Sequence, residues 1–118
     1  MHASLKRLHS PDVQVLEEFQ PSEEFGVLIQ MFAGPSDGLG EESFDFILCT
    51  PAWLLKEVEQ KQIVIGHHHI IVGRYDYQEL WRFLERQCLA SVGHTWKEVA
   101  TKLSAIGKWE FDNDMARG

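Results

Sequence analysis

The chain has 118 residues, of which 44% are hydrophobic and 25% charged, and its formal net charge is −7. This size and composition are typical of a single globular core, so we expect residues 1–118 to form one domain. No apolar run exceeds four residues, whereas a membrane span needs about 20 and the core of a secretion signal about 7 to 15. We therefore expect a cytoplasmic protein with no membrane partner. An acidic surface also repels phosphate backbones, so nucleic acid is not an expected partner.

The pattern of apolar residues predicts three strands in the first half of the chain. Residues 5–9 alternate imperfectly, residues 26–33 are rich in large apolar side chains, and residues 43–49 place alternate apolar side chains on one face. Residues 34–40 have the glycine and proline content of a flexible loop. We therefore expect residues 26–49 to form an antiparallel hairpin with a long loop.

Capping residues mark the expected helix starts. Thr50 can cap a helix over residues 51–60, whose first residue is proline, a residue tolerated at that position. Asp76 and Thr95 each precede a glutamate by three residues, and apolar residues follow both at helical spacing. Gly107 is well placed to end the last of these helices. The sequence thus predicts three helices.

Two further strand segments complete the expected architecture. Residues 63–75 are β-branched and interrupted by glycines, which predicts one strand or two short strands with a bend. Residues 109–111 alternate and suggest a short closing strand. Because strands and helices come in blocks, the expected fold class is α+β, a mostly antiparallel sheet of four to five strands with about three helices packed on one face.

Three consecutive histidines raise the question of a metal site. On a strand, His67 and His69 would share one face and could supply two ligands, with His94 or Cys88 as a third. No zinc-binding spacing supports this set, so we expect half-exposed strand histidines, no metal and no cofactor. Cys49 and Cys88 fall on apolar patterns and are expected to be inert core thiols.

No nucleophile, phosphate-loop, kinase or calcium-loop pattern is present, so an enzyme is not expected. A small metal- or thiol-dependent enzyme using His67, His69 and Cys88 stays as one alternative. A ligand-binding or protein-binding scaffold module stays as another. Among the aromatic and arginine residues, Tyr75, Trp109 and Arg74 are candidates for contact with a partner protein.

Several short motifs recur along the chain in a recognisable order and spacing. They are Leu8-His9-Ser10-Pro11-Asp12, Glu42-Ser43-Phe44-Asp45, Cys49-Thr50-Pro51-Ala52-Trp53-Leu54, Tyr75-Asp76, Trp96-Lys97-Glu98-Val99 and Ile106-Gly107-Lys108-Trp109-Glu110-Phe111. Together they resemble the immunity protein 8 family. The resemblance covers about residues 5–112, and its most specific parts are Cys-Thr-Pro-x-Trp-Leu and Gly-x-Trp-Glu-Phe.

This resemblance implies a bacterial protein of a polymorphic-toxin or contact-dependent inhibition system. It would protect the producing cell by binding the toxic C-terminal domain of an effector, without catalysis of its own. The acidic charge would suit a nuclease with a basic cleft, because it would speed association and mimic the displaced phosphates. An apolar hairpin edge also leaves a homodimer open. The expected toxin-binding residues are Asp37, Glu41, Glu42, Tyr75, Trp109, Glu110, Asp112 and Asp114.

Overall fold

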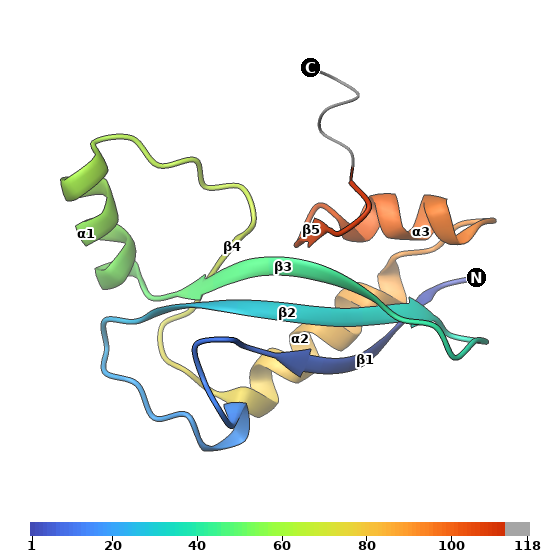
Figure 1. The fold of residues 1–118 in the computed structure, drawn as a ribbon, viewed down its shortest axis with the longest axis horizontal. Coiled ribbons are helices and arrows are strands. Elements are labelled where there is room, and N and C mark those ends of the chain that lie inside the picture. Colours follow the sequence, from blue (N-terminus) through green and yellow to red (C-terminus); the bar gives the residue numbers. More distant parts are fainter. Residues whose placement is uncertain (113–118) are drawn as a thin grey trace.

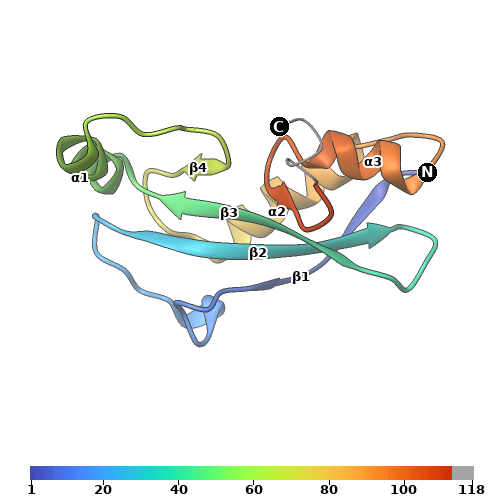
Figure 2. The same cartoon turned by 45° about the horizontal axis from the view of Figure 1, so that its top comes forward.

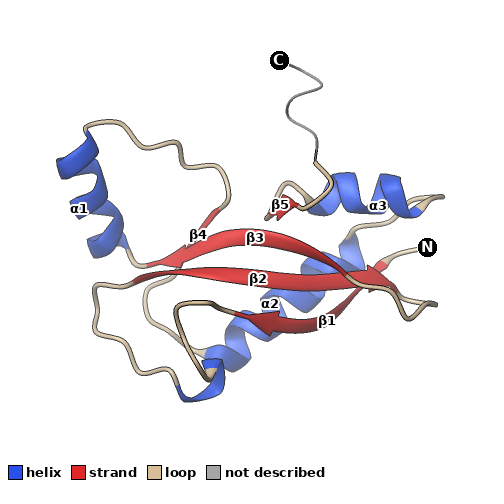
Figure 3. Ribbon diagram, in the orientation of Figure 1, coloured by secondary structure: helices blue, strands red, loops and turns tan. Residues whose placement is uncertain are grey.

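A computed structural model describes residues 1–112 as an α+β fold, which confirms the expected class (Figure 1 and Figure 3). None of the helices in this part of the chain is long and apolar enough to span a membrane. The strands are β1 (Ala3–His9), β2 (Gly26–Pro35), β3 (Glu42–Cys49), β4 (His69–Ile71) and β5 (Lys108–Trp109). The helices are α1 (Pro51–Lys61), α2 (Tyr77–Ala90) and α3 (Trp96–Leu103), and a 3-10 turn, η1, covers Leu16–Glu18.

The sheet is built on the predicted hairpin of β2 and β3. Strand β1 pairs antiparallel with β2, and β2 pairs antiparallel with β3. Two short strands share the other edge of β3: β4 runs parallel to residues 47–49, and β5 runs antiparallel to residues 44–45. The sheet is therefore mostly antiparallel, as expected, with β4 as its parallel member. This arrangement separates two ends of β3, one bounded by β5 and the other by β4.

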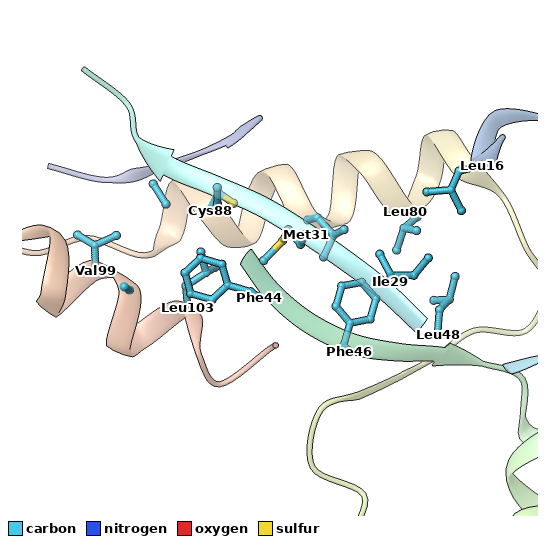
Figure 4. Packing of buried hydrophobic residues seen from close by; sticks show 14 of the residues in the cluster. Leu16, Ile29, Met31, Phe44, Phe46, Leu48, Leu80, Cys88, Val99 and Leu103 are labelled. Atoms are coloured by element: carbon cyan, nitrogen blue, oxygen red, sulfur yellow. The ribbon is translucent and has the colours of Figure 1, made fainter. Parts of the chain in front are cut away.

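One face of the sheet carries the hydrophobic core (Figure 4). Alternate residues of β2 and β3 point to this face because side chains alternate along a strand. Helices α2 and α3 cover it, and each of the larger side chains contributes about 1.5–3 kcal/mol by its burial. The buried side chains include Ile29, Met31, Phe44, Phe46 and Leu48 from the strands, and Leu80, Leu84, Cys88, Val99 and Leu103 from the helices.

All three predicted helix caps are confirmed. The backbone N–H of Trp53 donates to the Thr50 hydroxyl, and that of Glu79 donates to the Asp76 carboxylate. The backbone N–H of Glu98 donates in the same way to the Thr95 hydroxyl. These bonds satisfy amide groups that the first turn of a helix leaves without a partner. The capping residues therefore predicted correctly where each of the three helices begins.

Helix α1 differs from the other two because none of its residues is buried. Figure 2 shows α1 and the chain that follows it raised away from β2 and β3. The helix is anchored by Trp53, which packs so closely on Gly26 that a Cβ atom at Gly26 would lie 2.2 Å from the indole ring. Glycine is therefore required at the start of β2 for this contact.

The expected strand over residues 63–75 is wrong for most of its length, because only His69–Ile71 forms a strand. Gln62 and His68 have positive φ angles of 67° and 61°, which an extended strand cannot contain. Ile63 and Ile65 are 83% and 79% exposed. Their β-branched character favoured a strand, but the backbone of residues 63–67 pairs with no strand of the sheet, and contact with β3 begins only where the Ile47 N–H donates to the His68 carbonyl.

Gly107 does not end α3, which stops at Leu103 with Ser104 as its C-cap. Gly107 is instead buried against β3, where an added Cβ atom would lie 2.9 Å from the backbone of Phe44. This close approach lets β5 reach the sheet. The closing strand covers Lys108–Trp109 rather than residues 109–111, because a turn begins at Glu110.

Candidate functional site

Glu42 lies at the centre of the β5 end of the sheet. Its Oε1 accepts hydrogen bonds from Trp96 Nε1 at 2.7 Å and from Trp109 Nε1 at 2.8 Å. Phe44 packs between the same indoles, stacked on Trp109 and edge-on to Trp96. One carboxylate oxygen thus joins β3, α3 and β5. A hydrogen bond to an ionised acceptor is stronger than a neutral one, so Glu42 stabilises this end of the fold.

Ser43 and Glu110 make a second connection between β3 and the end of β5. The backbone N–H of Ser43 donates to Glu110 Oε1 at 2.8 Å, and the N–H of Glu110 donates to the Ser43 carbonyl at 3.0 Å. Asp45 follows on the same strand, and its Oδ1 is buried without a hydrogen-bond partner among residues 1–112. Burial raises the pKa of Asp45, with a smaller opposing effect from a Gln30 hydrogen bond. Acidic groups are therefore concentrated here.

The remaining acidic candidates lie around this end. Asp37 is exposed in the loop between β2 and β3, and Glu41 pairs with Arg7 at 2.7 Å next to that loop. Asp112 follows β5, and its backbone N–H donates to the Trp109 carbonyl. We call Asp37, Glu41, Glu110 and Asp112 the acidic end. Asp114 lies outside the described residues.

Tyr75 lies at the opposite, β4 end of the sheet. Its hydroxyl donates to the Leu16 carbonyl at 2.7 Å, and its ring contacts Phe19 and Phe25 edge-on. Burial raises the pKa of Tyr75 to about 12. The structure therefore places Trp109 near the acidic candidates and Tyr75 away from them. The contacts of Tyr75 instead hold η1 against the sheet.

The histidines form no metal site in the described part of the chain. His68 Nε2 lies 2.8 Å from the Ser104 carbonyl oxygen, and His69 Nδ1 lies 3.2 Å from that of Gly66. The His67 ring packs on His68 rather than pointing to a shared centre. Among residues 1–112, no group of three histidine, cysteine or acidic side chains could hold a metal ion.

The cysteines are buried, as predicted, and both are free thiols. Burial raises the pKa of Cys49, and it raises the pKa of Cys88 to about 12, with a smaller contribution from the charge of Glu85. The thiolate is the reactive form of cysteine, and these environments disfavour it. The geometry therefore gives no support to a thiol-dependent enzyme.

A groove of about 840 Å³ lies at the β4 end, between the segment that follows β4 and residues 79–86 of α2. Sequence reasoning identified Arg74 on its rim but missed two further arginines, Arg82 and Arg86. Their spacing of four residues on a predicted helix was a signal that could have found them. The groove is lined by Leu48, Ile70, Ile71, Val72, Gly73, Arg74, Tyr75, Asp76, Glu79, Leu80, Arg82, Phe83 and Arg86.

Comparison with protein-family models gives a match to immunity protein 8 over residues 3–114, nearly the whole chain. The chain belongs to the immunity protein 8 family. Searches of curated proteins and of solved structures gave no match. Membership implies an immunity protein whose partner is a toxin, and it favours a non-enzymatic inhibitor.

The motifs that suggested the immunity protein 8 family meet in space. Glu42 bonds to Trp96 and Trp109, and Ser43 bonds to Glu110, so three motifs that are distant in sequence form one cluster. The motifs around Thr50 and Asp76 supply two helix caps and the Trp53 contact with Gly26, and in the Leu8–Asp12 motif Asp12 accepts a hydrogen bond from the Leu28 backbone of β2. In this immunity protein the recognisable residues therefore hold the fold together.

Proposed function

We propose that this chain is a cytoplasmic immunity protein that neutralises a cognate toxin domain by forming a stoichiometric complex with it. The observation that carries the proposal is the family match over nearly the whole chain. Such a complex would bury on the order of 1,600 Å² and cover the toxin's active site or substrate groove. Inhibition by coverage requires a folded surface and no chemistry of its own, which agrees with buried thiols of raised pKa.

We propose the acidic end, together with Asp114 and the exposed edge of Trp109, as the surface that faces the toxin. Trp109 is half-buried, so part of its indole remains available as an apolar anchor. Glu42 lies behind this surface, where its two hydrogen bonds orient the indoles. Tyr75 is too far along the sheet to join it and supports η1 instead.

A toxic nuclease is the partner class that this surface suits best. The charge of −7 attracts a basic substrate cleft over a long range and raises the association rate. Carboxylates at the acidic end would occupy the positions of substrate phosphates. Charge complementarity between the acidic end and a basic cleft is what supports this partner class.

Charge reversal tests the proposed surface directly. The toxin's C-terminal domain, taken from the gene adjacent to this chain and inactivated in its catalytic site, would be titrated with the variant Asp37→Lys/Glu41→Lys. Glu23→Lys/Glu59→Lys is the matched control, since both glutamates are exposed and the net charge changes equally. Calorimetry gives affinity and stoichiometry, and stopped-flow fluorescence gives the association rate.

We expect a one-to-one complex, with affinity reduced at least about tenfold by the acidic-end variant and much less by the control. Equal effects of the two variants would show that net charge matters but that the acidic end does not contact the toxin. A folded chain that forms no complex would contradict the proposal as a whole.

A further inference from the structure

The groove at the β4 end combines an apolar floor with a cationic rim. Leu48, Ile70 and Leu80 form part of its lining, and the residues Ile71 and Phe83, which also line it, are 53% and 37% exposed. Arg82 and Arg86 come from successive turns of α2, and Arg74 comes from the segment that leads into this helix. Apolar and aromatic groups next to arginine are the composition of protein-binding hot spots.

The arginines of this groove are only weakly paired within the described part of the chain. Neither Arg82 nor Arg86 makes an ion pair or hydrogen bond within residues 1–112, and both are exposed. Arg74 approaches Asp76 only to 3.8 Å, with its own side chain 79% exposed. An exposed pair of this length contributes little and leaves the guanidinium available.

The carboxylates of the lining offset this rim only in part. Asp76, whose other oxygen accepts the capping bond of α2 from the Glu79 backbone, and Glu79 are the two acids of the lining, and they face three guanidinium groups, which leaves one positive charge in excess. The chain contains five arginines, Arg7, Arg74, Arg82, Arg86 and Arg117, so three of the five line one groove of a protein whose charge is −7. The cationic groove is therefore a local reversal of the overall charge.

We propose that this groove binds an acidic segment of a partner protein, with one apolar side chain on the floor and flanking carboxylates on the arginines. Guanidinium groups bind carboxylates in a planar, two-pronged geometry that lysine cannot provide. A free phosphate would use the rim without the apolar floor, and a long polyanion would be repelled by the rest of the surface. The inference goes beyond the proposed function and stands whether or not the acidic end binds a toxin.

The cationic groove and the acidic end would allow one partner protein to make two separate contacts, one with each sign of charge. The acidic end adjoins the part of β3 that pairs with β5, and the groove adjoins the part that pairs with β4. Figure 1 shows β4 and the β2–β3 turn toward opposite ends of the long strands. A partner engaging both would need separate basic and acidic surfaces, which would exclude partners that carry only one of them.

The test uses the full chain labelled with ¹⁵N and a capped peptide of alternating glutamate and leucine as the probe. Amide shifts in two-dimensional spectra report where the peptide binds. A lysine–leucine peptide and inorganic phosphate are titrated in parallel. Arg82→Gln/Arg86→Gln removes the rim charge, and Lys61→Gln/Lys97→Gln removes equal charge from exposed positions outside the groove. The unperturbed spectrum of each variant verifies that it is folded.

We expect saturable shifts confined to Leu48 and residues 70–86 with the acidic peptide, with binding weakened at least about fivefold by the arginine variant and unchanged in the control. Phe83→Gln should also weaken binding, because it removes apolar surface from the groove. Shifts at other residues, equal binding of the lysine–leucine peptide, or no saturable binding would overturn the inference. Phosphate shifts that match those of the acidic peptide and survive in Phe83→Gln would overturn it too, since they would define a simple anion site.

Discussion

Replacing Glu42 with alanine removes the oxygen that two indole N–H groups share. Trp96 and Trp109 would lose acceptors at 2.7 and 2.8 Å, and both indoles are half-buried. A hydrogen bond to an ionised group contributes about 1.5–3 kcal/mol, which gives about 3–6 kcal/mol for the pair. Water can reach part of this site, so we expect a loss of about 2–4 kcal/mol in the free energy of unfolding. For a chain of this size the melting temperature should fall by about 10 °C.

Urea denaturation followed by tryptophan fluorescence measures this effect directly, because two of the four tryptophans are bonded to Glu42. Glu42→Gln keeps an oxygen acceptor without the charge, so its loss should be about half as large. Glu41→Ala is the matched control, since Glu41 makes only an exposed pair with Arg7 that contributes at most about 1 kcal/mol. If Glu42→Ala costs no more than Glu41→Ala, the shared carboxylate does not hold this end of the fold together.

Three further predictions follow from backbone contacts, thiol burial and titration. Gly34→Ala should lower stability by about 1–3 kcal/mol in thermal denaturation, because its Cβ atom would overlap the Gly40 carbonyl, whereas Gly66→Ala, with open space around it, should be nearly neutral. Cys49 and Cys88 should react with an aromatic disulfide reagent only after unfolding, and rapid reaction of the native chain would contradict their burial. Asp45 has a raised pKa in the fold, so the native state binds its proton more tightly and stability is lost as pH rises through that pKa. Asp45→Asn should therefore be at least as stable as the original chain at neutral pH. In denaturation curves its free energy of unfolding should fall less than that of the original chain as pH rises above about 4. A marked loss of stability at neutral pH would contradict this.

Local signals in the sequence were sufficient for the helices and the central hairpin. Thr50, Asp76 and Thr95 were recognised because a cap depends on bonds within a few residues of itself. Strands β2 and β3 were recognised because one face of each is buried and the other is not, which imposes alternation. The three helices and the mostly antiparallel sheet therefore followed from the sequence.

Features that depend on distant contacts were harder to predict. The strand expected over residues 63–75 reduces to three residues, since strand formation needs a neighbour that composition cannot supply. Gly107 was expected to end a helix, but its small size serves the approach of β5 to Phe44. In both cases the structure depends on whether segments far apart in the chain come into contact.

The candidate site was predictable in part. The acids near the β2–β3 loop and those after β5 were proposed together, and pairing of β3 with β5 brings Glu110 and Asp112 to the loop end of the sheet, whereas Asp114 lies outside the described residues. No local pattern indicated that Glu42 accepts hydrogen bonds from two indoles, because its partners lie 54 and 67 positions away. Tyr75 was grouped with the acids by residue type alone, and the fold places it at the other end.

Growth rescue tests the central claim most directly. Cells would express the toxin domain encoded beside this chain, alone or together with the chain, and growth would be followed with Asp37→Lys/Glu41→Lys and Glu23→Lys/Glu59→Lys in parallel. We predict that the original chain and the control restore growth and co-purify with the toxin, while the acidic-end variant protects poorly. A chain that is folded and abundant, yet neither binds the toxin nor restores growth, would contradict the account.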